Sequence, residues 1–86
     1  MKKLLYFSAT WCGPCRMLGP VMKEISDENI IEVDKIDVDT NDPRIAQYGV
    51  RNIPTVIMID ESGAELAKRV GASPKQVYID IINTHN

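Results

Sequence analysis

The chain has 86 residues, which is enough for one domain and too few for two of ordinary size. Apolar residues make up 44% of the chain and charged residues 26%, a globular composition that excludes an intrinsically disordered protein. The formal net charge of -2 lacks the basic excess of a nucleic-acid-binding surface, so we predict no nucleic-acid partner.

The first apolar run predicts neither export nor a membrane anchor. It ends at Ser8 and is shorter than the ~7 to 15 apolar residues of a signal peptide. No stretch of the sequence approaches the ~20 apolar residues of a membrane span. We therefore expect a cytoplasmic protein with no membrane partner. Because cytosolic thiols are kept reduced, the two cysteines need an explanation other than a structural crosslink.

Turn residues and apolar periodicity divide the chain into seven elements in the order β-α-β-α-β-β-α. The apolar run from Lys3 to Ser8 predicts a buried strand. The next segment predicts a helix from about Cys12 to Asp27. Pro20 should kink this helix rather than end it, because the apolar stripe continues beyond the proline. The stripe consists of Leu18, Val21, Met22 and Ile25.

The middle of the chain predicts a strand and a short helix. Ile30 to Val38 is rich in Ile and Val but carries interspersed charges, which predicts a strand with an exposed or edge position. Asp42 and Pro43 are favourable at the start of a helix, and Gly49 is favourable at its end.

The last third of the chain predicts a hairpin followed by a helix. The runs from Thr55 to Ile59 and from Glu65 to Val70 flank a polar turn, so these two strands should pair antiparallel. The segment from Ser73 to Gln76 predicts a capping box with Pro74 at the first helical position. The buried stripe of this helix is Val77, Tyr78, Ile81 and Ile82.

These elements together predict an α/β fold class. A β-α-β unit crosses over right-handed and makes its two strands parallel, whereas the hairpin adds antiparallel strands. The expected result is a small mixed sheet with helices on its faces.

The segment Cys12-Gly13-Pro14-Cys15 lies between the first strand and the first helix. Unpaired N–H groups and the positive end of the helix dipole favour a thiolate at Cys12. Cys15 lies one turn later, within the separation that a disulfide tolerates. The pair can therefore alternate between dithiol and disulfide without a large backbone movement.

Two structural roles for the cysteines stay open as alternatives. A plain crosslink would close a four-residue loop worth about 2 kcal/mol. A zinc site needs four ligands, and beyond the cysteines the chain offers only His85 near its end, where we expect it to be solvent-exposed. A zinc or iron–sulfur site shared between two copies would supply four thiolates.

The acidic segment from Asp37 to Asp42 briefly resembles a calcium-binding loop. It has Asp42 where such a loop needs glycine and Tyr48 where it needs a bidentate glutamate. We interpret these acids as a strand end and a helix cap, and we predict no bound metal.

The segment from Ser8 to Arg16, which contains Trp11-Cys12-Gly13-Pro14-Cys15, resembles the active-site segment of thioredoxins. Three further segments fall in the order expected for that family, so the resemblance covers nearly the whole chain. They are Lys35 to Asp39, Val50 to Thr55 and Lys68 to Ala72. The resemblance implies thiol–disulfide exchange through a mixed disulfide, with Cys12 attacking and Cys15 resolving.

The same resemblance implies a single thioredoxin-like domain over residues 1–86 with a minimal four-stranded mixed sheet. Typical members begin with a further strand and helix, which this sequence does not show. The strand from Ile30 to Val38 should therefore lie at an edge of the sheet, where its charges discourage further pairing.

The resemblance also assigns roles around the cysteines, with Gly13 and Pro14 as active-site support. Pro54 would be the family's cis-proline, and it would leave the backbone of Ile53 free to bind a substrate peptide. Trp11 would be a flat contact surface, and Gly71 would line the substrate groove. The alternatives are a trans proline that starts a strand, a half-buried tryptophan without chemistry and an ordinary turn glycine.

One residue expected to lie buried near the cysteines differs from the family pattern. Many thioredoxins carry a buried aspartate six residues before the first cysteine, and this chain has Tyr6 there. A phenol of ordinary pKa ~10 is not a base near neutrality. We expect deprotonation of Cys15 to rely on water or another group, with Lys35 either tuning the site or lying solvated at the sheet edge.

The sequence therefore predicts a small monomeric disulfide reductase that needs no metal or bound cofactor. Its substrates would be protein disulfides, and a flavin-containing thioredoxin reductase would supply its electrons. One alternative is a glutaredoxin-like redoxin reduced by glutathione. The other is a docking subunit of a larger enzyme, which would use the surface around Trp11, Ile53, Pro54 and Gly71 with incidental redox activity.

Overall fold

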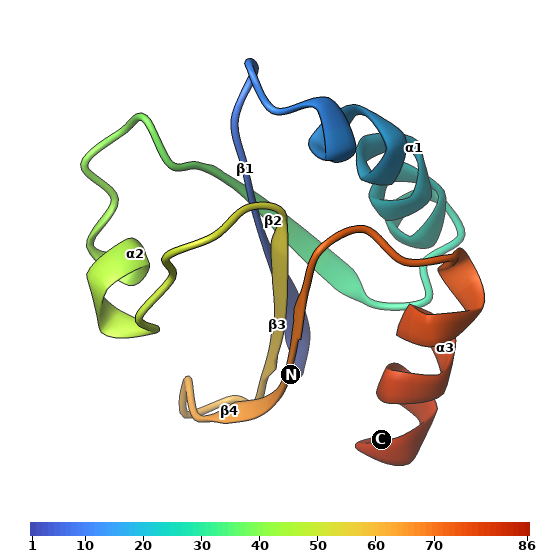
Figure 1. The fold of residues 1–86 in the computed structure, drawn as a ribbon. Helices are drawn as coiled ribbons and strands as arrows, with labels where there is room; N and C mark the ends of the chain where they lie inside the picture. Colours follow the sequence, from blue (N-terminus) through green and yellow to red (C-terminus); the bar gives the residue numbers. More distant parts are fainter.

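A computed structural model describes residues 1–86, and it confirms the predicted order of seven elements. Helices α1 and α3 cover one face of the sheet and α2 covers the other (Figure 1). The α/β fold class with a four-stranded mixed sheet is confirmed. The elements are β1 (Lys3–Ser8), α1 (Gly13–Asp27), β2 (Glu32–Asp37), α2 (Pro43–Gln47), β3 (Thr55–Ile59), β4 (Glu65–Val70) and α3 (Lys75–Thr84).

The sheet has the strand order β2-β1-β3-β4, so the charged strand β2 lies at an edge as predicted. Strand β1 runs parallel to β2 and antiparallel to β3, and the β3–β4 hairpin is antiparallel. Strand β2 is shorter than the predicted Ile30 to Val38, because the chain is still turning out of α1 there. Asn29 has a φ of 55°, and the N–H of Ile30 donates to the carbonyl of Ile25.

The alternation of side chains along the central strands divides the core into two layers. Leu4 and Tyr6 pack toward α1 and α3, whereas Leu5 and Phe7 pack with β3 residues on the α2 side. Both layers are fully buried at β1 and β3, because each of these strands has a neighbour on both sides and helices on both faces.

Helix α1 begins where the cysteine motif predicts and runs through Pro20 to Asp27. Its N-cap is Cys12, whose Sγ accepts a hydrogen bond from the N–H of Cys15 at 3.2 Å. Leu18, Met22 and Ile25 form its buried stripe. The apolar stripe holds the helix on the sheet beyond the proline, which has no N–H to donate.

The predicted capping box at α3 is wrong. The helix begins at Lys75, and its N-cap is Pro74 with no side-chain hydrogen bond to the first turn. The hydroxyl of Ser73 instead accepts from Nε of Arg69 at 2.9 Å, and its N–H donates to the hydroxyl of Tyr78 at 3.2 Å. Ser73 therefore ties the end of β4 to α3 rather than capping the helix.

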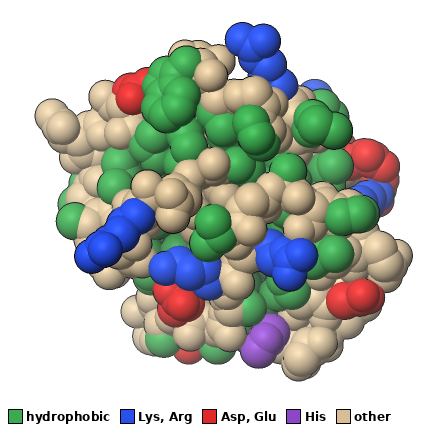
Figure 2. All heavy atoms as spheres, viewed as in Figure 1, with side chains coloured by type: hydrophobic (Ala, Val, Ile, Leu, Met, Phe, Trp, Pro, Cys, Tyr) green, Lys and Arg blue, Asp and Glu red, His purple; other side chains and the backbone are tan.

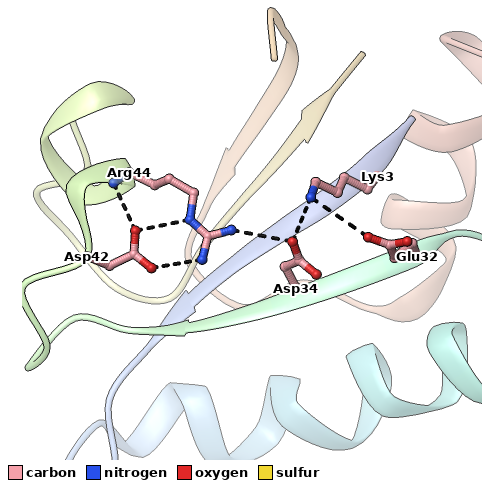
Figure 3. Close-up of polar contacts among 5 residues, drawn as sticks. All are labelled: Lys3, Glu32, Asp34, Asp42 and Arg44. Atoms are coloured by element: carbon pink, nitrogen blue, oxygen red, sulfur yellow. Dashed lines mark hydrogen bonds and ion pairs between the residues drawn. The ribbon is translucent and has the colours of Figure 1, made fainter. Parts of the chain in front are cut away.

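A chain of ion pairs joins β1, β2 and α2 on the α2 side of the sheet (Figure 3). Nζ of Lys3 lies 3.8 Å from Glu32 and 2.8 Å from Asp34. Arg44 contacts Asp34 at 3.4 Å and Asp42 at 2.8 Å. Hydrogen bonds from the Arg44 side chain and backbone lower the pKa of Asp42 from 3.8 to about 2. The network fixes α2 against the edge strand.

This network predicts an acid-sensitive contribution to stability. Because the pKa of Asp42 is depressed in the folded state, its contribution is present above pH 3.8 and is lost as the pH falls through about 2. Arg44→Ala should lower the melting temperature by a few degrees at pH 6, and the difference from the unmodified chain should shrink toward pH 2. Thermal unfolding followed by circular dichroism across this range measures the difference.

Lys23→Ala, which removes an exposed ion pair within α1, is the matched control. A deficit that stays constant down to pH 2 would contradict the assignment.

Candidate functional site

The two cysteines form a disulfide at the junction of β1 and α1. Their Cα atoms are 5.3 Å apart, and each residue is only 5% exposed. Cys12 caps the helix with its sulfur, and Gly13 and Pro14 form the first helical positions. The pair thus has the placement and separation of a CXXC redox site.

The helix start favours negative charge on the first sulfur. The N–H of Cys15 already donates to Sγ of Cys12 at 3.2 Å in the disulfide form. The same N–H and the positive end of the α1 dipole would stabilise a thiolate at Cys12 once the bond is reduced. No acidic residue in the first turn of α1 opposes that effect.

Trp11 lies beside the pair as an exposed aromatic, with 66% of its surface accessible. Its Nε1 donates to Oδ2 of Asp39 at 2.8 Å, and the N–H of Asp39 donates to Oδ1 of Asp37 at 2.9 Å. Sequence reasoning missed the role of Asp39. The one available signal was topological, because the carboxyl ends of two adjacent parallel strands lie side by side.

The β3 side of the site brings together the other expected residues. The Ile53–Pro54 peptide bond is cis, and Pro54 is buried. Ile53 packs against the cluster that contains both cysteines. The carbonyl of Pro54 accepts from the N–H of Gly71 at 2.8 Å, so the loop after β4 lies against the loop before β3. Gly71 has a φ of 88°, a conformation that favours glycine.

Large apolar side chains are exposed in the segments near the disulfide. Trp11 is joined by Met17 at 76% exposure and Val70 at 53%. In Figure 2 hydrophobic side chains gather along the upper part of the molecule, where Figure 1 places the β1–α1 turn. Such a surface suits contact with another polypeptide.

Tyr6 lies beneath the site with 2% of its surface exposed. Its hydroxyl donates to the carbonyl of Cys15 at 3.0 Å. Burial raises the pKa of Tyr6 above its ordinary value of 10.0. The position therefore holds a neutral hydrogen-bond donor that fixes the first turn of α1, and it supplies no base near neutrality.

Lys35 lies opposite Tyr6 in the β1–β2 register. Both residues line a cavity of about 220 Å³ that Cys15 also lines. Lys35 is exposed at the sheet edge and forms no ion pair. The geometry thus links Lys35 to the second cysteine.

Other candidate positions contribute nothing to this site. His85 is the partly buried C-cap of α3 rather than the exposed residue we expected, and no group of three or more potential ligands is placed to hold a metal ion. Asp42 caps α2 through the N–H of Arg44, as the sequence predicts. None of the helices combines the length and the apolar character that crossing a membrane requires.

Comparison with known proteins agrees with this geometry. The family model described as Thioredoxin matches residues 1–84. Thioredoxin from Haemophilus influenzae is 44% identical over 84 residues, which are 95% of this chain and 78% of that protein. Thioredoxin from Bacillus subtilis is 38% identical over 81 residues, covering 92% of this chain and 77% of the relative.

Solved structures give the same result at the level of the fold. A mutant thioredoxin from Halobacterium salinarum superposes with a TM-score of 0.88 at 36% identity, covering 96% of this chain and 73% of its own. Thioredoxin from Fasciola hepatica gives 0.87 at 32% identity, with 99% and 81% covered. The family match, the fold and the Cys12–Cys15 pair together identify the chain as a member of the thioredoxin family of thiol–disulfide oxidoreductases.

Proposed function

We propose that this chain reduces protein disulfides as a monomeric unit formed by residues 1–86. The observation that carries the proposal is the Cys12–Cys15 disulfide at the N-terminus of α1, with the N–H of Cys15 directed at Sγ of Cys12. The Cys12 thiolate attacks a substrate disulfide and forms a mixed disulfide. Cys15 then attacks Cys12, which restores the Cys12–Cys15 bond and releases the substrate as two thiols.

The surface around the pair suits an extended substrate segment. Ile53 makes no backbone–backbone hydrogen bond within the chain, so its N–H and carbonyl are available for strand-like pairing. Trp11 offers a flat apolar face, while Gly71, which has no side chain, permits a close approach of the substrate backbone. We assign substrate binding to Trp11, Ile53, Pro54 and Gly71. Gly13, Pro14 and Lys35 support the active site.

The family assignment favours a thioredoxin reductase over glutathione as the electron donor. The similarity to thioredoxins extends over 95% of the chain for the Haemophilus influenzae relative. The chemistry between the two cysteines needs no metal or organic cofactor, because the two thiols themselves carry the electrons and become a disulfide when they give them up. We place this activity in the cytoplasm, where reduced thiols prevail.

Cys15→Ser should stop the cycle at the mixed disulfide. Cys12 can still attack, but no thiol remains to displace the substrate, so turnover falls at least about a hundredfold. Mass spectrometry of the variant mixed with a disulfide peptide should show the covalent adduct. The matched variant Cys12→Ser should form no adduct. An adduct that forms on Cys15 in Cys12→Ser, at the rate of the unmodified chain, would reverse the assigned roles.

The pair should have a reducing potential near the value of about -270 mV typical of thioredoxins. Equilibration with glutathione and dithiothreitol buffers, with disulfide reduction assayed on the same sample, measures it. A value near -120 mV would indicate an oxidase instead. A pair that exchanges too slowly to turn over would favour the docking alternative.

Asp39→Asn should weaken substrate binding through Trp11. The indole would keep a neutral hydrogen-bond partner in place of a charged one, and the KM for a protein disulfide should rise about two- to fivefold with little change in kcat. Fluorescence anisotropy of Trp11, the single tryptophan, should fall as the ring gains freedom. Asp80→Asn, an acid on α3, is the control. Unchanged anisotropy and KM would show that Asp39 does not position Trp11.

A further inference from the structure

The resolving cysteine lines a cavity that is large enough for water. The cavity has a volume of about 220 Å³ and lies between the start of α1 and the carboxyl ends of β1 and β2. A water molecule occupies roughly 30 Å³ in the liquid, so several fit. The titratable and charged residues that line it are Tyr6 from β1, Cys15 and Arg16 from α1, and Lys35 and Asp37 from β2.

Asp37 supplies the only carboxylate among the lining residues. The pairing of Ser8 with Asp37 places the acid on the same face of the sheet as Tyr6 and Lys35. Its Oδ1 is fixed by the N–H of Asp39 at 2.9 Å. Its Oδ2 accepts no hydrogen bond from the chain, and the residue takes part in no ion pair. One oxygen anchors the carboxylate and the other is free to bind water.

The cations at this cavity are also unpaired. Neither Arg16 nor Lys35 forms an ion pair, whereas Lys3 and Arg44 both pair with Asp34 on the opposite face. Unpaired positive charge close to Cys15 favours its thiolate over its thiol. Tyr6 is the remaining ionisable residue that lines the cavity, and its buried phenol stays neutral.

We propose that Asp37 receives the proton of Cys15 through water in this cavity during the resolving step. The proposal rests on the proposed function and adds to it a proton acceptor at a different place in the fold from the position of Tyr6. Asp37 does not touch the reacting sulfurs. It acts through the water of the cavity that it lines. Lys35 and Arg16 stabilise the Cys15 thiolate that forms.

The step balances in atoms and electrons. The S–H proton of Cys15 passes through water to the Asp37 carboxylate. The Cys15 thiolate then forms a bond to Sγ of Cys12, and the bond between Cys12 and the substrate sulfur breaks. The leaving thiolate takes the electron pair and then a proton returned by Asp37 or by solvent. The substrate disulfide is thereby reduced by two electrons and the dithiol is oxidised by two.

The test is the rate of the resolving step in Asp37→Asn. The asparagine amide oxygen can still accept from the N–H of Asp39, so the variant keeps that contact and loses the proton acceptor. The probe is dithiobis(nitrobenzoate) in excess, followed by stopped-flow absorbance. Each reduced enzyme releases one coloured thiolate on attack and a second on resolution, and the second phase is independent of probe concentration.

The expected result is a second phase about a hundredfold slower than that of the unmodified chain at pH 7. The two rates should converge above pH 9, because a thiol with an ordinary pKa of ~8.5 then ionises without help. Asp37→Glu should restore much of the rate at pH 7. Asp27→Asn is the matched control, since Asp27 lines the adjacent groove with Tyr6 and Lys35 but not the cavity of Cys15. Its second phase should be that of the unmodified chain.

Three outcomes would overturn the proposal. They are an unchanged second phase in Asp37→Asn, a deficit of the same size at every pH, and a deficit shared by Asp27→Asn. A failure of the proposed function is separable from all of these. In that case the second thiolate of the unmodified chain would be released at a rate proportional to the probe concentration, because each cysteine would react with the probe separately, or it would not be released at all.

Discussion

Strand β1 lies at the centre of the sheet, paired in parallel with β2 and antiparallel with β3. Its residues from Leu4 to Ser8 are at most 3% exposed, so the strand has no freedom to shift in register without exposing the core. The carboxyl end of β1 leads directly into the cysteine turn. The position of the disulfide is therefore set by the packing of a strand that is buried from Leu4 to Ser8.

The pairing of β1 also determines what surrounds the disulfide. Parallel pairing brings the end of β2 beside the end of β1, with Asp37 opposite Ser8. Antiparallel pairing brings the start of β3 to the same end of the sheet as the carboxyl ends of β1 and β2, with Thr55 opposite Phe7 and Pro54 immediately before it. Segments that are far apart in sequence thus meet at one end of the sheet, because β1 is paired on both sides. The Trp11–Asp39 contact and the cluster that joins Ile53 to the cysteines both depend on this arrangement.

Much of this architecture is predictable from local sequence signals. The α2 helix begins after Asp42 and is followed by Gly49 at a φ of 62°, as the cap and the terminal glycine predict. The hairpin and the edge position of β2 also follow from residue type. The long apolar stripe of α1 correctly predicts a helix that continues beyond Pro20.

Contacts between distant residues were less accessible to sequence reasoning. Ser73 has the local features of a helix cap, but Arg69 competes for its hydroxyl across the β4–α3 turn. Asp37 and Asp39 read as ordinary strand-end acids, since nothing local distinguishes an acid that faces a cavity from one that faces solvent. Their positions relative to Trp11 and Cys15 depend on the β1–β2 register, which pairs residues about 29 positions apart, such as Ser8 and Asp37.

The side chains of β2 alternate between the two faces of the sheet, and this alternation separates paired charges from unpaired ones. Asp34 points to the α2 side, where Lys3 and Arg44 neutralise it in the ion-pair network. Lys35 and Asp37 point to the α1 side, where both remain unpaired beside the cavity of Cys15. The paired charges fix α2 against the edge strand, whereas the unpaired charges remain accessible to water in the cavity. A shift of one residue in the β2 register would interchange the two faces, so the same pairing that holds the edge strand also keeps ionisable groups beside the second sulfur.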